Sequence, residues 1–226
     1  MKAKNIITVL LWAATLLTAD AKDSKLTQAM KGADSIVWAG LDYSLVKMIG
    51  STNAIRAPGL LLQDMPSRWN DLFLDERIED VGISLGKLIH IDIAGVTERN
   101  RQLKPSQVEL NSPAKDIIKE SHLTAKGIAD AVQSMKLSRT EGLGLVFIVD
   151  RLVSERRLKP RKNQNDSALN YIERAGAAYV VFFDVATREV LSMKREARVT
   201  GSSGNFRNSW FGPVKEIDEG LSQYRE

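Results

Sequence analysis

The fold is decided by the stretch Ala177–Glu226, which reads AAYVVFFDVATREVLSMKREARVTGSSGNFRNSWFGPVKEIDEGLSQYRE. Its apolar run at Tyr179–Val185 predicts a buried strand, Ala186–Arg188 predicts a turn, and Glu189–Val199 predicts the returning strand of a hairpin. Apolar residues then recur at spacings of three and four between Arg207 and Tyr224, which predicts a helix. The chain is therefore expected to end in a β-hairpin followed by a closing helix.

Upstream of this hairpin, the apolar patterns predict strands that alternate with helices. The expected strands are Ser35–Tyr43, Leu88–Ile93 and Gly142–Val153, and the expected helices begin near Pro66 and at Thr124. This order is typical of a layered α/β fold, so we predict a single α/β domain over residues 35–226 with a mixed sheet. The polar segment Gly95–Ser112 is predicted to be a long loop or lid.

The N-terminus has the pattern of a signal peptide. Two lysines precede the apolar run Ile6–Ala19, and Ala19–Ala21 supplies the small residues of a cleavage site. We expect residues 1–21 to be removed, which leaves residues 22–34 as a lead-in to the domain. The apolar run is short for a membrane span, so we expect no transmembrane segment after cleavage; an uncleaved anchor is the alternative. The expected location is the periplasm, with the extracellular space as the alternative.

The composition excludes several classes of protein. The chain contains no cysteine, which excludes disulfides, a cysteine nucleophile, thiolate metal sites and the lipid anchor of bacterial lipoproteins. Apolar residues make up 43% of the chain, so a core can form without disulfides. The formal net charge of +4 bears on solubility and does not indicate nucleic-acid binding.

The sequence offers few residues for catalysis. There are only two histidines, His90 and His122, and no H-E-x-x-H motif occurs. We therefore predict no metal and no cofactor. Asp42, Asp150 and Asp184 lie at or near the ends of predicted strands. They could meet as the carboxylate pair of a hydrolase, or they could cap strands and turns.

A basic segment is the first candidate for binding. Ser154–Asp166 is predicted to be a basic loop between two strands, and Arg156, Arg157 and Arg161 lie in it. This loop could contact an anionic surface, or it could simply be solvated. It lacks the interleaved aromatic residues of a single-strand nucleic-acid platform, so no nucleic-acid partner is expected.

A polar and aromatic corner is the second candidate. Arg207, Asn208 and Trp210 follow a glycine-containing turn near the C-terminus. They could anchor the last helix on the sheet, with Arg207 paired to a carboxylate such as Asp184. Alternatively, the same side chains could form a ligand pocket.

Some segments resemble known proteins. Phe182–Leu191 and Gly204–Trp210, which read FFDVATREVL and GNFRNSW, resemble the ending of a group of uncharacterised exported bacterial proteins, and Gly40–Ser44 and Gly142–Val149 resemble two of their strands. This resemblance implies export and brings no known reaction. A weaker similarity, at the level of the fold, links the chain to two kinds of protein. One is the curli secretion channel subunit, and the other is the group of lipoproteins that activate penicillin-binding proteins, the synthases of peptidoglycan. Arg188 stands where those proteins usually have glycine, and their lipid-bearing cysteine is missing here.

We therefore expect an exported, non-enzymatic binding or assembly module of the bacterial cell envelope. Its expected partner is an envelope protein or an anionic surface. The alternative is a periplasmic hydrolase that uses carboxylate chemistry. A deep pocket with several titratable groups of shifted pKa would favour the hydrolase. An exposed apolar patch or a free sheet edge would favour the binding module.

Overall fold

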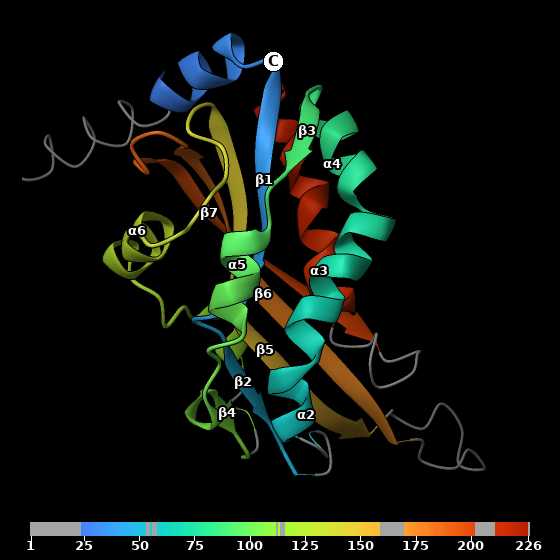
Figure 1. Ribbon diagram of the computed structural model, residues 1–226. Helices are drawn as coiled ribbons and strands as arrows, with labels where there is room; N and C mark the ends of the chain where they lie inside the picture. The colour runs from blue at the N-terminus through green and yellow to red at the C-terminus, as the bar shows by residue number, and fades with distance from the viewer. Residues whose placement is uncertain are drawn as a thin grey trace, which may run out of the picture.

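A single mixed sheet runs through the molecule. The computed structural model describes residues 24–52, 55, 58–111, 113, 116–158, 170–201 and 211–225 of the 226-residue chain. These residues form a mostly parallel, open sheet of seven strands with helices on both of its faces (Figure 1). The strands are β1 Ser35–Asp42, β2 Lys47–Gly50, β3 Leu88–Ile91, β4 Val108–Glu109, β5 Leu143–Leu158, β6 Asn170–Asp184 and β7 Val190–Gly201. The predicted α/β fold with a mixed sheet is confirmed.

Strand β5, which is 16 residues long, organises the sheet. One of its edges pairs with β6 in antiparallel orientation, and β6 pairs in the same way with β7. Its other edge pairs in parallel with two short strands in succession, first β1 at residues 143–148 and then β2 at residues 151–154. Strand β3 extends the sheet beyond β1, and β4 extends it beyond β2. β1 and β2 together therefore act as one strand that is interrupted at residues 43–46.

The helices fill the connections between strands and follow the last strand. They are α2 Pro58–Gln63, α3 Met65–Glu76, α4 Ile78–Leu85, α5 Ala94–Asn100, α6 Ala125–Gln133 and α8 Gly212–Lys215, with the 3-10 helices η1 Pro105–Gln107, η2 Ile117–Lys119 and η3 Glu216–Tyr224. Residues 24–32 are also helical. In the described part of the chain, no helix has both the length and the apolar character needed to cross a membrane.

The smaller of two apolar cores lies between the sheet and the pair α5 and α6. Val96 of α5 and Ile128 and Val132 of α6 pack with Val37 of β1 and Val146 of β5. Each of these side chains is buried. Because side chains alternate between the two faces of a strand, the neighbouring residues of β1 and β5 point into the other core.

The larger core lies on the opposite face and is rich in aromatic residues. The Trp38 ring stacks on Phe73 with centroids 4.9 Å apart, and Phe147 meets Trp38 edge-on at 5.0 Å. Phe211, directly before α8, meets Phe73 at 6.5 Å. Burying each phenylalanine stabilises the fold by roughly 1.5–3 kcal/mol. The C-terminal helices are thus anchored on the same aromatic cluster as β1, β5 and α3.

Several predicted boundaries agree with the structure. Helix α3 follows its N-cap residue Asp64 and carries Pro66 in its first turn, where the missing N–H costs nothing. Helix α6 begins after Thr124, whose Oγ1 accepts a 3.1 Å hydrogen bond from the Gly127 backbone N–H. The predicted hairpin is formed by β6 and β7, which are joined by the turn between Asp184 and Val190.

Other boundaries differ from the sequence prediction. Gly95–Ser112 is not simply a long loop, because it contains most of α5, then η1 and β4. Strand β5 runs on to Leu158, so residues 154–158 of the predicted basic loop belong to the sheet, and residues 159–169 lie outside the described residues. The last helix begins at Gly212 and is mostly a 3-10 helix, while residues 202–210 lie outside the described residues. The lead-in is part of the fold, since Leu26 and Met30 are buried in the larger core.

Candidate functional site

The interruption between β1 and β2 is the most unusual feature of the sheet. Asp42 is paired with Ile148, and Lys47 with Arg151, so four residues on one side of the interruption face two residues of β5. Residues 43–46 form a turn that leaves the sheet, closed by a 3.0 Å hydrogen bond from the Val46 N–H to the Tyr43 carbonyl. Backbone groups that leave the ladder need other partners when they are buried.

Side-chain amides supply those partners. Asn70 of α3 accepts a 2.7 Å hydrogen bond from the Leu41 N–H and donates to the Leu41 carbonyl at 2.9 Å. Asn100, at the end of α5, accepts from the Tyr43 N–H at 2.7 Å and also donates to the Leu41 carbonyl at 2.8 Å. Gln107 of η1 donates to the carbonyls of residues 44 and 46 at 3.1 and 3.0 Å. The interruption is therefore held in one conformation from three directions.

Asp42 fixes an arginine at the same place. Its carboxylate is fully buried and accepts hydrogen bonds from Arg99 Nε at 2.9 Å and from the Ser44 N–H at 2.8 Å. The Arg99 guanidinium also donates to Ser44 Oγ at 2.6 Å and to Oγ of Ser134, the residue that directly follows α6. Arg99 is thus oriented by the buried carboxylate and by hydroxyl groups.

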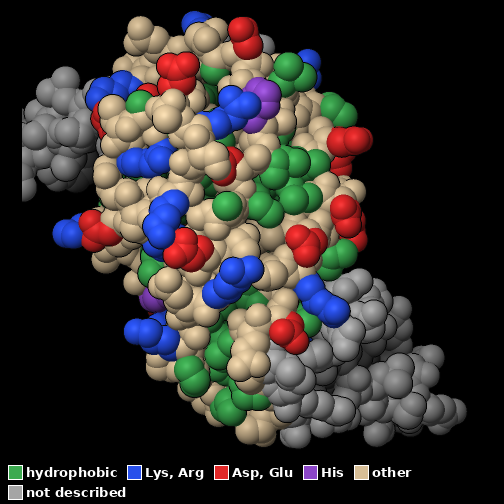
Figure 2. Space-filling model, viewed as in Figure 1, with side chains coloured by type: hydrophobic (Ala, Val, Ile, Leu, Met, Phe, Trp, Pro, Cys, Tyr) green, Lys and Arg blue, Asp and Glu red, His purple; other side chains and the backbone are tan. Residues whose placement is uncertain are grey.

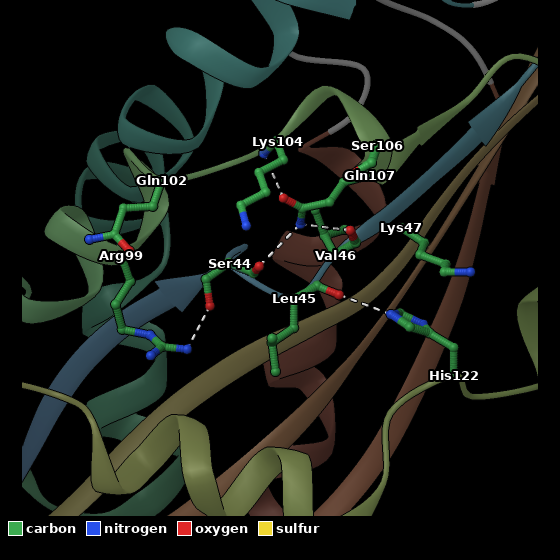
Figure 3. Close-up of a pocket in the computed structure, with 10 residues that line it drawn as sticks. All are labelled: Ser44, Leu45, Val46, Lys47, Arg99, Gln102, Lys104, Ser106, Gln107 and His122. Atoms are coloured by element: carbon green, nitrogen blue, oxygen red, sulfur yellow. Dashed lines mark hydrogen bonds between the residues drawn. The ribbon is translucent and has the colours of Figure 1, made fainter.

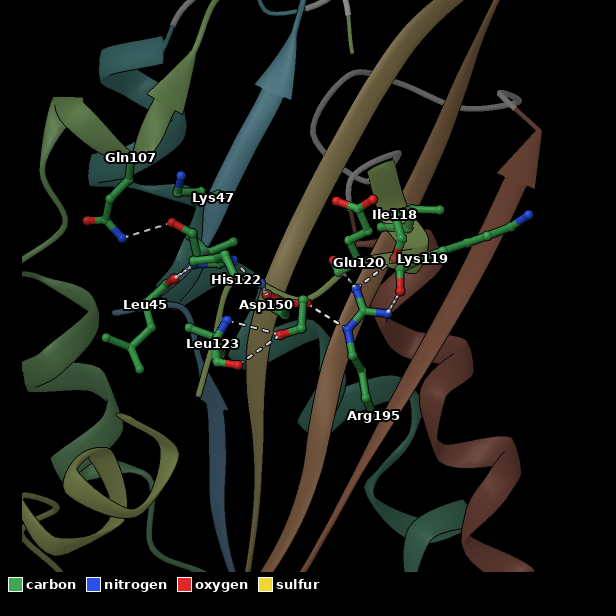
Figure 4. A network of polar contacts seen from close by, with 12 residues as sticks. Leu45, Lys47, Gln107, Ile118, Lys119, Glu120, His122, Leu123, Asp150 and Arg195 are labelled. Atoms are coloured by element: carbon green, nitrogen blue, oxygen red, sulfur yellow. Dashed lines mark hydrogen bonds and ion pairs between the residues drawn. The ribbon is translucent and has the colours of Figure 1, made fainter. Parts of the chain in front are cut away.

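Asp150 forms a second buried cluster directly opposite the interruption (Figure 4). It is the extra residue of a β-bulge, because Val149 pairs with Ala178 and Arg151 pairs with Ala177. Its fully buried carboxylate accepts a 2.7 Å hydrogen bond from Arg195 Nε. Sequence analysis placed Asp150 near the end of a strand, whereas it lies within β5.

His122 completes this cluster. Its Nδ1 lies 2.7 Å from Asp150 Oδ1, and its Nε2 lies 2.9 Å from the carbonyl oxygen of Leu45. Arg195 in turn donates to the backbone carbonyls of Ile118 and Glu120 at 2.6 and 3.0 Å. The cluster therefore ties the segment around η2 to the interruption and to β5.

The charged neighbours determine the pKa of Asp150. Burial is the largest influence and by itself raises the pKa of this carboxyl group. The contacts with His122 and Arg195 together outweigh burial, so the pKa is lowered from its usual value. Asp150 is held as a carboxylate, which suits an acceptor of hydrogen bonds and not a general acid.

A pocket of about 450 Å³ opens beside the interruption (Figure 3). It is lined by Ser44, Leu45, Val46, Lys47, Arg99, Gln102, Lys104, Ser106, Gln107 and His122. The charged residues in this lining are all basic, and the remaining polar ones are hydroxyls and amides. A pocket of this composition can hold a polar or anionic molecule, but its lining offers no carboxylate to act as a nucleophile or base.

Other groups with a shifted pKa lie outside the pocket lining. Burial raises the pKa of Tyr43 and lowers that of Arg174. The hydrogen bond to Asp218 raises the pKa of Arg77, whereas burial, together with the charges of Asp80 and Glu219, raises the pKa of Asp218 by more than Arg77 lowers it. The main cause differs between the two partners: it is the ion pair for Arg77 and burial for Asp218. The Asp218 side chain is 2% exposed whereas that of Arg77 is 25% exposed, so the cost of desolvation falls mainly on the carboxylate.

Asp184 has a structural position at the β6–β7 turn. Its Oδ1 accepts hydrogen bonds from the Thr187 N–H at 2.7 Å and from Thr187 Oγ1 at 2.8 Å. This is the turn-capping alternative that we considered for this residue. Asp184 is not among the residues that line the pocket at the interruption.

The other predicted binding residues fall largely outside the described structure. Arg161, Arg207, Asn208 and Trp210 lie outside the described residues. Arg156 and Arg157 belong to β5, and their side chains are outside what the structure describes. The basic segment and the C-terminal corner therefore stay as sequence predictions.

The pocket residues themselves were not selected from the sequence. Arg99, Lys104 and Gln107 lie in the segment that the sequence predicts to be a loop. Only the tertiary fold brings Arg99 and Gln107 into hydrogen bonds with Ser44 and places Lys104 in the same pocket lining. In the sequence, His122 belongs to no motif that points to its partners. Within the described residues, no group of three or more His, Asp and Glu side chains is placed to hold a metal ion. No protein-family model and no curated protein matches this chain.

Proposed function

We propose that this chain is an exported binding or assembly module of the bacterial cell envelope, without a catalytic activity of its own. The observation that carries this proposal is the separation of the carboxylates from the pocket. Asp42 and Asp150 are both fully buried, and each is occupied by an arginine. The pocket lining holds basic, hydroxyl and amide side chains instead.

A hydrolase that uses carboxylate chemistry needs a different arrangement. Glycosidases, for example, place two carboxyl groups about 5–9.5 Å apart on either side of the bond that is cleaved. The carboxylates of Asp42 and Asp150 accept hydrogen bonds from Arg99 and Arg195, respectively. The Asp184 carboxylate accepts one from the Thr187 N–H within the β6–β7 turn. The geometry therefore supports the binding module over the hydrolase.

A free sheet edge adds support for a role in assembly. Among the described residues, strand β3 pairs only with β1, and its Leu88 and Ile91 are 71% and 54% exposed. Ile83 of the adjacent helix α4 is 68% exposed. Figure 2 shows apolar side chains gathered on the face where β3 and α4 lie. Exposed apolar residues at an unpaired edge are typical of surfaces through which proteins associate.

The location rests on the sequence. Residues 1–21 have the charged, apolar and small-residue regions of a signal peptide. The resemblance of Phe182–Leu191 and Gly204–Trp210 to exported bacterial proteins agrees with it. The periplasm is the proposed location, and an envelope protein or an anionic surface is the proposed partner.

The test combines capture with an activity screen. The mature protein, a Leu88→Lys/Ile91→Lys double variant and a Val199→Lys control are used to capture partners from envelope extracts. Val199 is a suitable control because it is 58% exposed and lies on β7, away from β3. We expect a partner that wild type and control retain and the double variant loses. Turnover of ester or glycoside substrates by the mature protein, with no partner recovered, would contradict the proposal.

A further inference from the structure

The charges around the pocket are unequal. Lys47, Arg99, Lys104 and His122 all line it, whereas no aspartate or glutamate among the described residues does. Lys47 is paired with a glutamate at 3.1 Å and extends away from Ser44 in Figure 3. Lys104, whose side chain is exposed, therefore supplies a charge that is unpaired among the described residues, on the side of the pocket that also carries Arg99. The Arg99 guanidinium is held there by the buried Asp42.

Arg99 is prepared to bind an anion. Its Nε, one Nη1–H and one Nη2–H donate to Asp42, Ser134 and Ser44. A guanidinium has five N–H donors, so two have no partner among the described residues. Because the side chain is already fixed, a ligand that accepts these two hydrogen bonds loses little affinity to ordering.

Lys104 supplies a charge without a carboxylate partner. Its side chain is exposed and runs from η1 toward Ser44 and Gln102 in Figure 3. Within the part of the chain that the structure describes, no acidic side chain forms an ion pair with its Nζ. Its backbone N–H donates to the Gln107 side chain at 2.8 Å, which fixes the start of η1 at the pocket.

The uncharged lining indicates the rest of the ligand. Ser44, Gln102 and Ser106 offer hydroxyl and amide groups, and the apolar lining residues among those described are Leu45 and Val46. The described lining holds no Phe, Tyr or Trp ring on which a nucleobase could stack. The volume of about 450 Å³ lies within the range of small-molecule sites and is far larger than a bare phosphate needs.

We infer that this pocket binds a phosphate-bearing polyol, such as a sugar phosphate or a glycerol phosphate group, with the phosphate at Arg99 and Lys104 and the hydroxyls at Ser44, Gln102 and Ser106. Arginine and lysine are the usual partners of phosphate, and arginine binds it through several directed hydrogen bonds. This inference rests on the proposed binding function, because it assigns a ligand to the same module. A free sugar phosphate and a lipid headgroup share the recognised chemistry.

Calorimetric titration of the mature protein tests this inference. Glycerol 3-phosphate and glucose 6-phosphate are expected to bind, whereas glycerol and glucose are not. Lys104→Ala is expected to weaken binding about tenfold, since it removes a charge-assisted contact. Lys126→Ala is the matched control, because Lys126 is an exposed lysine on α6 outside the pocket. Lys104 is exposed, so its substitution leaves the fold intact, and Arg99→Lys provides a second pocket variant.

Further experiments distinguish the possible ligands and show which result would overturn the inference. Sedimentation with vesicles of phosphatidylglycerol, compared with phosphatidylcholine, distinguishes a lipid headgroup from a soluble phosphate. Equal binding of glucuronate would overturn the assignment of phosphate, and so would binding that Lys104→Ala leaves unchanged. If no phosphorylated polyol binds but the envelope partner is still captured, the ligand assignment is wrong and the proposed function stands. Substrate turnover without a partner would instead remove the proposed function.

Discussion

Arg195 of β7 reaches across β6 and donates a 2.7 Å hydrogen bond to Asp150, the bulged residue of β5. This contact joins two strands that are not neighbours in the sheet. Arg195 also donates to the backbone carbonyls of residues 118–120, so one guanidinium joins β5, β7 and η2. The bulge turns the carboxylate of Asp150 toward this partner. Asp150 also lies opposite the interruption between β1 and β2.

Asp150→Asn is expected to lower the free energy of unfolding by about 3 kcal/mol at pH 7, because it leaves the partly buried Arg195 without its carboxylate partner. The pKa of Asp150 is lowered in the folded state. Its contribution is therefore complete above the unfolded pKa of about 3.9 and is lost as the pH falls through the lower folded pKa. Urea denaturation at several pH values between 7 and 3 should show the difference between wild type and variant shrinking at the acid end.

Asp130→Asn is the control for this prediction. Asp130 lies on α6 and forms an exposed ion pair with Lys126. Such pairs contribute at most about 1 kcal/mol, so the control should resemble wild type at each pH. A difference between wild type and Asp150→Asn that stays constant down to pH 3 would contradict the lowered pKa.

Asp218 is expected to have the opposite dependence on pH. Burial raises its pKa in the folded state. The folded protein therefore binds a proton at a higher pH than the unfolded chain does, and the free energy of unfolding gains from this group as the pH falls through the folded pKa toward about 3.9. Asp218→Asn removes this gain. The stability of wild type relative to Asp218→Asn should rise between pH 7 and pH 4 in urea denaturation, and a fall would refute the raised pKa.

Tyr43→Phe is expected to leave the free energy of unfolding unchanged or to raise it by up to about 1 kcal/mol. The Tyr43 hydroxyl is buried and has no hydrogen-bond partner among the described residues. A buried hydroxyl without a partner costs about 1–3 kcal/mol. Tyr43→Ala is the contrasting variant and should lose about 3–5 kcal/mol, because it leaves a cavity beside Trp69, whose ring lies 5.2 Å away. Loss of stability in Tyr43→Phe would reveal a partner for the hydroxyl.

Gly40→Ala is expected to lower the free energy of unfolding by about 2 kcal/mol or more. Gly40 has a φ of 110°, and a Cβ atom there would lie 2.7 Å from Asn70 Oδ1. The substitution strains the backbone and displaces the amide that satisfies Leu41. Gly59→Ala in α2 is the control, since a Cβ atom there meets nothing within 4 Å. Thermal unfolding should separate the two variants, with the control at or above the wild-type midpoint.

The elements with strong local patterns could be predicted from the sequence. The apolar run of β6 and the turn after Asp184 predict the β6–β7 hairpin, because buried strands and turns have compositions of their own. The cap at Thr124 and the proline at position 66 likewise locate the starts of α6 and α3. These signals depend on residues close together in the chain.

Helix α5 and the pocket had no such signal. Gly95 lowers helix propensity, yet it is needed because α5 approaches the backbone of Lys136 so closely that a Cβ atom would lie 2.1 Å from its carbonyl oxygen. The interruption at residues 43–46 depends on amides from Asn70, Asn100 and Gln107. These are distant in sequence, and a single amide residue has no pattern that indicates its partner.

The order in which the sheet is assembled from the chain has a consequence for synthesis. Strands β5, β6 and β7 follow one another and can pair as soon as they emerge, whereas Ile36 of β1 pairs with Leu143. A chain that is made from its N-terminus therefore exposes the apolar residues of β1, including Trp38, long before their partner strand exists. Pairing between such distant segments is slow. The first strand to be synthesised is thus the one that depends longest on a chaperone, or on being kept unfolded, to escape aggregation.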